Sequence, residues 1–172
     1  MAEFFKLENV KLKQRIQELE DRLVNVVGLF KAIMPADINS YVEGLISSPQ
    51  KEMKIVAKEV DSSFADCIIK AAQAGKKIRL VTSERPKEKP KILPPNLQAY
   101  EKLKNIQGID VIETPNLTQI LIILPKKAFF SAGSLTRENF ARNNQLGFEI
   151  GEKGLLEQVQ EIFAGYLPSF MR

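Results

Sequence analysis

The run Ile120-Leu121-Ile122-Ile123-Leu124 constrains the fold most strongly, because five consecutive aliphatic side chains leave no polar face for water. A strand of this kind must be buried on both faces, as in a sheet that helices cover on each side. Pro125-Lys126-Lys127 follows as a turn, and Ala128-Phe129-Phe130 predicts the second, antiparallel strand of a hairpin. The chain is therefore predicted to form a layered α/β domain.

Upstream of this hairpin, two strand-like segments flank an amphipathic helix. Residues 54–57 and 78–82 are apolar enough for strands, and Ser62 or Ser63 can cap the helix between them, which ends at Gly75. A strand, helix and strand in this order form a right-handed crossover with parallel strands. Together with the hairpin, this unit predicts a mixed sheet.

The remaining elements complete an α/β domain that we predict over residues 35–172. Residues 83–95 hold four prolines and can only be a loop. We predict helices over 37–46, 96–106 and 154–167, strands over 109–113 and 148–150, and a helix start at Thr136.

Residues 1–34 are predicted as a coiled-coil dimerisation helix that ends at Pro35. With Asn9 at one a position, apolar residues alternate in steps of four and three, which is typical of a heptad seam. In a parallel homodimer, Glu8 of one copy would face Lys13 of the other, and Arg15 would face Glu20. Both pairs join opposite charges across the two helices. The predicted seam is Phe5, Asn9, Leu12, Ile16, Leu19, Leu23, Val26, Phe30 and Ile33.

A second interpretation of the same helix is that it packs on its own domain. Val24, Val27 and Leu29 widen the apolar face beyond a narrow seam. Both interpretations can hold, with a zipper first and packing against the domain later.

Composition narrows the chemistry that the chain can perform. It has no histidine and one cysteine, Cys67, which exclude a Ser-His-Asp triad, a histidine-ligated zinc and a disulfide framework. We expect no cofactor and no metal. No apolar run reaches about 18 residues and the start does not read as a signal peptide, so we expect a cytoplasmic protein without a membrane partner.

The whole chain has a net charge of +4, and its positive charge is concentrated in one segment. Residues 76–104 hold nine Lys or Arg against three Asp or Glu, so this segment carries +6 and the rest carries −2. A basic loop of this kind is an electrostatic footprint for DNA or RNA, although a solvated loop has the same composition. The candidate nucleic-acid-binding residues are Arg85, Lys87, Lys89 and Lys91.

Three stretches, in order, resemble phospholipase D-like domains. Residues 68–82 resemble the family's helix followed by A-x-x-x-G-V-K-V-R-V-L-T. Residues 128–136 are similar to A-I-I-G-S-A-N-L-T, and residues 143–150 to N-N-E-x-G-V-x-I. The resemblance covers residues 36–167 and implies one half-domain of that α/β fold, a mixed sheet flanked by helices.

The catalytic motif of that family, His-x-Lys-x4-Asp, falls on Thr118, Ile120 and Pro125. In the family the histidine attacks phosphorus and the lysine neutralises phosphate oxygens. Thr118 is not an activated nucleophile, and the other two side chains carry no charge. Ser134 and Gln145 likewise replace a supporting Asn and Glu. The resemblance implies a catalytically degenerate domain, and we expect that the protein is not an enzyme.

From the coiled coil onward the layout is similar to archaeal transcription regulators of the TrmB type, whose degenerate phospholipase D-like domain senses sugars. This resemblance implies a homodimeric module with a ligand-sensing or regulatory role. A nucleic-acid-binding protein that uses loop 85–91 is the alternative. The candidate pocket for a small ligand, such as a sugar or an anion, comprises Thr118, Ser134, Arg137, Asn139, Asn143 and Gln145.

Overall fold

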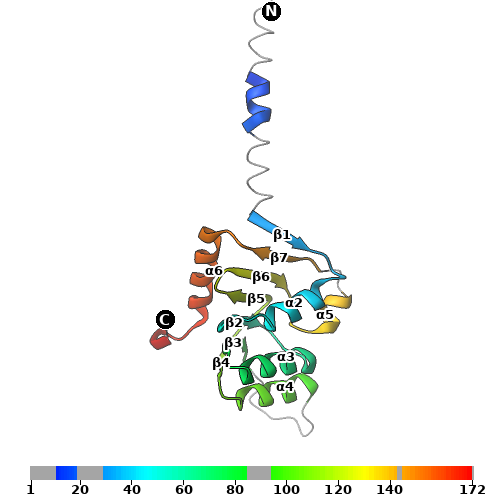
Figure 1. The fold of residues 1–172 in the computed structure, drawn as a ribbon, viewed down its shortest axis with the longest axis vertical. Helices are drawn as coiled ribbons and strands as arrows, with labels where there is room; N and C mark the ends of the chain where they lie inside the picture. Colours follow the sequence, from blue (N-terminus) through cyan, green and yellow to red (C-terminus); the bar gives the residue numbers. More distant parts are fainter. Residues whose placement is uncertain (1–10, 19–28, 85–93, 143–144, 172) are drawn as a thin grey trace, which may run out of the picture. The chain divides into compact units, whose positions relative to one another are not determined.

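The structure, a computed structural model, describes residues 11–18, 29–84, 94–142 and 145–171. The chain divides into two compact units, Met1–Lys31 and Ala32–Arg172. Within the first unit, residues 11–18 are helical. The second unit is an α/β domain built on a mixed sheet (Figure 1).

The elements follow the predicted order closely. The strands are β1 (Phe30–Ile33), β2 (Glu52–Ala57), β3 (Lys77–Ser83), β4 (Ile109–Thr114), β5 (Gln119–Leu124), β6 (Lys127–Ala132) and β7 (Gly147–Ile150). The helices are α2 (Ile38–Ile46), α3 (Ser62–Gln73), α4 (Pro95–Lys104), α5 (Arg137–Arg142), α6 (Lys153–Tyr166) and the short 3-10 helix η1 (Ser169–Met171).

The seven strands lie in the order β1-β7-β6-β5-β2-β3-β4. β2 pairs in parallel with β3, and β3 pairs in parallel with β4, so the predicted crossover is confirmed. β5 runs antiparallel to β2 and forms the predicted hairpin with β6, which pairs with β7. The sheet is therefore mixed, as the sequence predicts.

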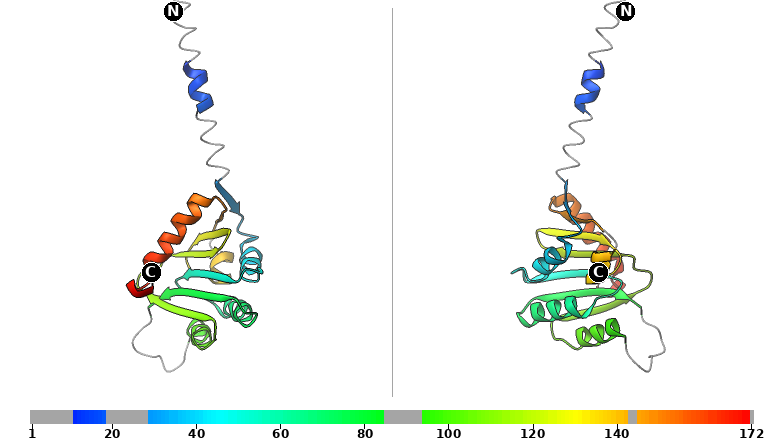
Figure 2. Two further views of the ribbon diagram at one scale, coloured as in Figure 1. Left: turned by 60° about the vertical axis from the view of Figure 1, so that its left-hand side comes forward. Right: turned by 90° about the vertical axis from the view of Figure 1, so that its right-hand side faces the viewer.

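Helices cover both faces of the sheet (Figure 2). α2, α3 and α4 lie on one face and α6 lies on the other. The first face buries Phe64, Phe129 and Phe140, and the second buries Phe163 of α6. Residues 120–124 of β5 alternate between these two cores and are all buried, which confirms that this strand is covered on both faces.

The start of the domain differs from the prediction. Phe30 and Ile33 were expected in the coiled-coil helix, but they lie in β1. Ile33 is buried beside Gly147, a position where a Cβ would come within 2.3 Å of the Phe129 ring. Pairing at the sheet edge satisfies backbone groups that a helix end would leave open, so tertiary contacts override the heptad pattern here.

The N-terminal cap of α3 also differs. Neither Ser62 nor Ser63 is the cap, because both belong to the helix itself. Asp61 takes that position, and its Oδ1 accepts a hydrogen bond of 2.8 Å from the Phe64 backbone N–H. A carboxylate caps as well as a hydroxyl and also favours the positive end of the helix dipole.

Several of the predicted interaction residues lie outside the described residues. Of the predicted dimer seam these are Phe5, Asn9, Leu19, Leu23 and Val26. The basic loop residues Arg85, Lys87, Lys89 and Lys91, and Asn143 of the predicted ligand pocket, lie outside them as well. Leu12 and Ile16 are described, and their side chains are 58% and 53% exposed.

Candidate functional site

The strand register brings the polar residues of interest to one end of the sheet, which we call the carboxyl edge. Here β2, β3, β4 and β6 end and β5 begins. Its loops are residues 58–61 after β2, residue 84 after β3 and residues 133–136 after β6, together with Thr118 before β5. In α/β sheets, ligands bind preferentially beyond the carboxyl ends of parallel strands.

Backbone hydrogen bonds join two of these loops. The Asp61 N–H donates to the Leu135 carbonyl at 3.1 Å, and the Leu135 N–H donates to the Glu59 carbonyl at 2.9 Å. Val60 and Leu135 form an isolated parallel bridge, and both side chains are buried. The loop after β6 is therefore held beside the loop after β2, although the two lie more than 70 residues apart in the chain.

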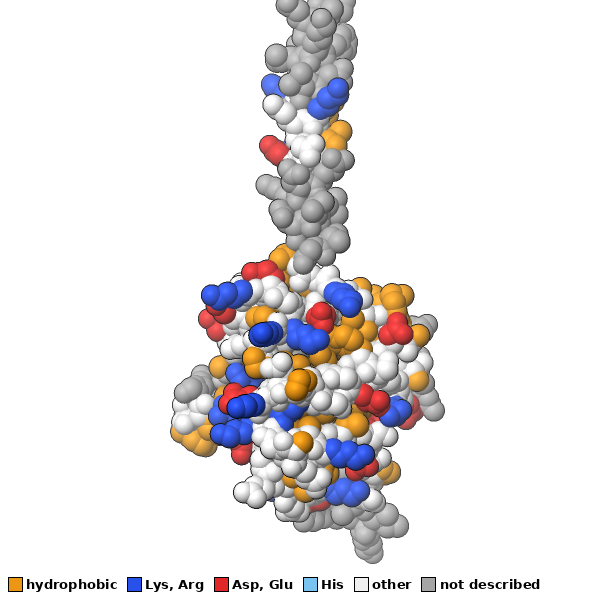
Figure 3. Space-filling model, in the orientation of Figure 1, with side chains coloured by type: hydrophobic (Ala, Val, Ile, Leu, Met, Phe, Trp, Pro, Cys, Tyr) orange, Lys and Arg blue, Asp and Glu red, His pale blue; other side chains and the backbone are white. Residues whose placement is uncertain are grey.

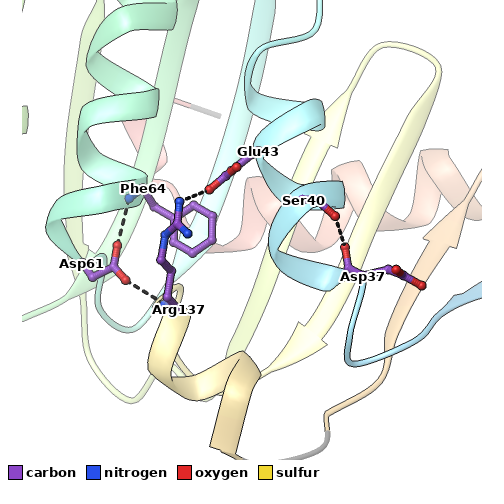
Figure 4. Close-up of polar contacts among 6 residues, drawn as sticks. All are labelled: Asp37, Ser40, Glu43, Asp61, Phe64 and Arg137. Atoms are coloured by element: carbon purple, nitrogen blue, oxygen red, sulfur yellow. Dashed lines mark hydrogen bonds and ion pairs between the residues drawn. The ribbon is translucent and has the colours of Figure 1, made fainter.

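Asp61 and Arg137 together link α3, α5 and α2 at this edge (Figure 4). Besides capping α3, Asp61 accepts through its Oδ2 a hydrogen bond of 2.7 Å from the Arg137 backbone N–H at the start of α5. The Arg137 guanidinium forms an ion pair with Glu43 of α2. Arg137 was predicted as a ligand-binding residue, but in this arrangement its charge is already paired with a carboxylate.

A second polar cluster surrounds Gly133, which has a φ of +87°. The Gly133 N–H donates to the Thr118 carbonyl at 2.8 Å, so the start of β5 and the end of β6 remain paired. The Asn139 side-chain amide donates to the carbonyls of Ala132 and Ser134 and to Gln145 Oε1, at 3.2, 2.9 and 3.0 Å. The cluster holds the turn in place through bonds within the protein.

The structure therefore brings together part of the predicted ligand pocket. Thr118, Ser134, Asn139 and Gln145 lie around the Gly133 turn. Arg137 points instead to α2. Most of the polar atoms of Asn139 and Gln145 bond to each other or to the turn, so the geometry explains them first as structural residues.

The three positions of the family's catalytic motif are separated in the structure. Thr118 is exposed at the carboxyl edge, and Ile120 is fully buried in the core beneath α2 and α3. Pro125 is exposed at the other end of β5, in the turn to β6. Thr118 alone among the three lies where a ligand at the carboxyl edge could reach it.

A cavity of about 270 Å³ opens at the carboxyl edge between the ends of β2 and β3 and helix α4. Val60, Leu80 and Leu103 are buried apolar residues of its lining, and the Thr82 hydroxyl donates to the Lys58 carbonyl at 3.1 Å. None of the predicted ligand-binding residues that the structure describes is among its lining residues. The lining residues are Lys58, Glu59, Val60, Leu80, Thr82, Ser83, Glu84, Pro94, Leu97, Tyr100 and Leu103.

Sequence reasoning missed these lining residues, although a signal for them existed. Lys58 and Glu59 directly follow the buried strand β2, and Glu84 directly follows β3. The rule that ligands bind beyond the carboxyl ends of parallel strands selects these positions once the crossover is predicted. The family motif drew attention to the neighbouring strand β5 instead.

Two other kinds of feature are absent among the described residues. No helix there is long and apolar enough to span a membrane. In the same part of the chain, no group of three or more Cys, Asp or Glu side chains is placed to hold a metal ion.

Comparisons with solved structures identify the fold as that of phospholipase D-like proteins. Nuc from Salmonella typhimurium, a phospholipase D family member, matches with a TM-score of 0.67 and 15% identity over 80% of this chain and 92% of that one. Phosphatidylserine synthase from Haemophilus influenzae matches with a TM-score of 0.65 and 12% identity, over 83% of this chain and 38% of that one. The predicted phospholipase D-like α/β fold with a mixed sheet is confirmed, whereas the N-terminal coiled coil stays a prediction.

A third match covers more of this chain. TrmBL2, an archaeal chromatin protein with a novel mode of DNA binding, matches with a TM-score of 0.56 and 17% identity, over 96% of this chain. The matched part is 64% of the TrmBL2 chain. No family model matches the sequence, and no curated protein matches it.

These comparisons correct one prediction. We expected that the protein is not an enzyme, and that prediction is wrong, because the structures that share its fold include a phosphatidylserine synthase and a phospholipase D family member. The prediction extended the replacement of three side chains, Thr118, Ile120 and Pro125, to the whole chain. Because enzymes share this fold, the replacement of these three side chains is not enough to predict that the protein lacks enzyme activity.

Proposed function

We propose that this protein is a homodimeric, phospholipase D-like regulatory module that associates with DNA. The observation that carries the proposal is the similarity to the chromatin protein TrmBL2 over 96% of the chain. Because its identity to TrmBL2 is 17%, the similarity shows the fold alone, and the regulatory role rests on the arguments that follow.

The N-terminal segment supports a homodimer. Leu12 and Ile16 are four residues apart in a helical segment, so they lie on the same side of it, and each is more than half exposed in a single chain. They occupy d and a positions of the heptad pattern, where a second copy would bury them. A parallel coiled coil would then hold two domains as one assembly.

Analytical ultracentrifugation tests the dimer. We expect the parent protein to sediment as a dimer and the Leu12→Ala, Ile16→Ala double variant to dissociate, since each buried aliphatic side chain contributes about 2–5 kcal/mol. Gln14→Ala is the matched control, because Gln14 lies between the two on the opposite side of the helix. A parent protein that sediments at 19.4 kDa would refute the homodimer.

The basic loop is the proposed DNA contact. On the face drawn in Figure 3, basic and acidic side chains are interspersed, so the described residues there form no broad basic patch. Within segment 76–104, loop 85–91 alone holds four Lys or Arg against one Glu, a net charge of +3. Two copies in a dimer would present two such loops to one nucleic acid.

Salt dependence tests this contact. Neutralising Arg85, Lys87, Lys89 and Lys91 together should weaken duplex DNA binding and lower the salt slope by about 0.9 for each phosphate that the loop no longer neutralises. Neutralising Lys102 and Lys104 on α4 is a control for charge removed elsewhere in the same segment. DNA affinity that is unchanged by the fourfold substitution would exclude this loop as the contact.

The cavity at the carboxyl edge is the proposed site for a regulatory ligand. Its lining combines apolar side chains with a few polar and charged ones, a composition that is typical of small-molecule sites. Leu97→Trp would fill it from α4 without removing a polar group. A panel of sugars, scored by thermal stabilisation of the parent but not of this variant, tests the ligand-sensing role.

A further inference from the structure

A second cavity, of about 440 Å³, lies at the opposite end of the sheet, where β2 and β3 begin. The end of α2 and residues 47–51 form one wall, and the second half of α3 forms the other. Three charged side chains line it, Lys51, Lys70 and Lys76, and no acidic side chain is among its lining residues. We call it the lysine cavity.

Lys76 is the buried member of this group, with only 6% of the residue exposed. Its Nζ donates to the Ile46 carbonyl at 2.5 Å. An ammonium carries three N–H donors, so two remain for a further acceptor. Burial lowers the pKa of Lys76, and an anion bound beside the amine would offset that cost of burial.

Ser48 gives a second, independent indication. It lines the same cavity, and its Oγ is buried without a hydrogen-bond partner in the described part of the chain. Buried hydroxyl groups in folded proteins nearly always have a partner, and those that lack one require an explanation. A ligand oxygen in the cavity would provide that partner.

The ends of two helices reduce the positive charge in the cavity but do not cancel it. α2 and α3 both terminate at the cavity, and each helix C-terminus contributes about −0.5 of a charge. The three lysines contribute +3, so a net positive charge of about +2 remains. Burial, and then the nearby Glu43 carboxylate, raise the pKa of the Cys67 thiol, so this lining residue adds no negative charge at neutral pH.

We propose that the lysine cavity binds a small phosphorylated molecule, with Lys76 and Ser48 as the inner ligands of the phosphate and Lys51 and Lys70 as the outer ones. A phosphate has enough acceptor oxygens for several donors at once, and lysine binds it as a point charge. The cavity exceeds the size of a phosphate ion, and its apolar side chains, Ala71 and Ala74, suit the carbon skeleton of a sugar. A duplex phosphate is less suited, because Lys76 is buried.

Titration with ribose 5-phosphate, inorganic phosphate and a short DNA duplex tests the proposal, with NMR shifts of the Ser48 and Lys76 amides as the readout. We expect saturable binding of ribose 5-phosphate, weakened about tenfold to a hundredfold by Lys76→Gln, because a hydrogen bond to a charged group contributes that much. Lys77→Gln is the matched control, since Lys77 is exposed and does not line the cavity.

Ser48→Ala and Lys70→Gln keep the test decisive if Lys76→Gln does not fold. Each should weaken ribose 5-phosphate binding severalfold while the protein remains folded. Equal affinity in the parent, Ser48→Ala and Lys70→Gln proteins would overturn the proposal, and so would shifts caused by the DNA duplex alone. The fourfold variant of loop 85–91 separates this site from the proposed DNA contact. If that variant loses DNA binding but still binds ribose 5-phosphate, both proposals stand. If it binds DNA as the parent does, the loop contact alone is refuted.

Discussion

At the carboxyl edge, the polar groups around Asp61 and the Gly133 turn are bonded to one another, whereas at the lysine cavity the charged groups have one sign and the bonding of the polar groups is incomplete. Asp61 and Arg137 illustrate the first end, since each has protein partners for its charged group. Ser48 and Lys76 illustrate the second, where a hydroxyl lacks a partner among the described residues and an ammonium has spare donors. Saturated polar groups stabilise a fold, and unsaturated ones are available to a ligand.

This difference changes which residues of the domain we associate with binding. The family motif pointed to Thr118, Ser134 and Asn139, but their surroundings are the Gly133 turn and its hydrogen bonds. Substitutions at the carboxyl edge outside its cavity should therefore act mainly on stability. Substitutions in the lysine cavity should act mainly on ligand affinity and on the pH dependence of stability.

The largest expected effect is at Gly133. Gly133→Ala should lower the free energy of unfolding by about 3 kcal/mol, the upper part of the range for a non-glycine residue held at a positive φ. Its Cβ would also lie 2.7 Å from Asn139 Oδ1. Urea unfolding measures the change.

Gly44→Ala is the matched control for that experiment. Gly44 lies inside α2, and a Cβ there would meet no atom within 4 Å. The substitution should raise the free energy of unfolding by about 0.4–1 kcal/mol, because alanine restricts the unfolded chain. Equal effects of the two substitutions would show that the Gly133 turn is not held as tightly as we infer.

Asp61 should give the next largest effect. Asp61→Ala removes the cap of α3 and the acceptor for the Arg137 N–H, and it should cost about 2 kcal/mol of unfolding free energy. Asp61→Asn keeps one acceptor oxygen and should cost less. Asp66→Ala, at an exposed position of the same helix, is the control for removal of a carboxylate. Equal losses in Asp61→Ala and Asp66→Ala would contradict the capping role.

Substitution of Lys76 should change how the free energy of unfolding depends on pH more than it changes the magnitude of that free energy. Burial lowers the pKa of Lys76 in the folded state below the ordinary 10.5, so the unfolded chain binds the proton more tightly. The contribution of Lys76 is therefore least favourable at neutral pH, and it improves as the pH rises from the folded-state pKa toward 10.5. Lys76→Met should lack this improvement in urea unfolding across that range.

Lys77→Met is the control for Lys76→Met, because the Lys77 side chain is exposed at the adjacent position. It should keep the pH profile of the parent protein. A parent profile that matches that of Lys76→Met would show that Lys76 titrates as a solvated lysine, and the contrast between the two ends of the sheet would be weaker.

Much of the fold could be predicted from the sequence, because its signals are local. The apolar run of β5 specifies a strand buried on both faces, and the segment from β2 through α3 to β3 specifies a parallel crossover. β1 could not be predicted, since Phe30 and Ile33 fit a heptad as well as a strand. Only the long-range contact of Ile33 beside Gly147 selects the strand.

The candidate sites could be predicted less well, because they depend on contacts between distant segments. Nothing near Arg137 in the sequence shows that Glu43 pairs with its guanidinium. Likewise, Lys76 is one of many lysines in the sequence, and only the approach of Ile46 shows that it is buried. Composition gives the charges of these residues, but the packing of α2 against its neighbours decides which are paired.

The smallest expected effect is at Glu152, which follows β7 at the same end of the sheet as the lysine cavity. Its carboxylate caps α6 by accepting hydrogen bonds from the N–H groups of Gly154 and Leu155, at 2.8 and 2.7 Å. These two bonds lower the pKa of Glu152 below the ordinary 4.5. The contribution of this cap is therefore fully present above pH 4.5 and is lost as the pH falls through the folded-state pKa.

Glu152→Gln should lower stability slightly at neutral pH and converge with the parent protein in acid, which thermal unfolding from neutral to acidic pH would show. Glu161→Gln, at an exposed position further along α6, is the control for removal of a carboxylate and should follow the parent profile. A constant difference between Glu152→Gln and the parent at every pH would mean that the charge of Glu152 does not contribute to the cap. In that case, of the charged groups considered at this end of the sheet, only those of the lysine cavity would affect stability. The difference between the two ends of the sheet would then rest on the lysine cavity alone.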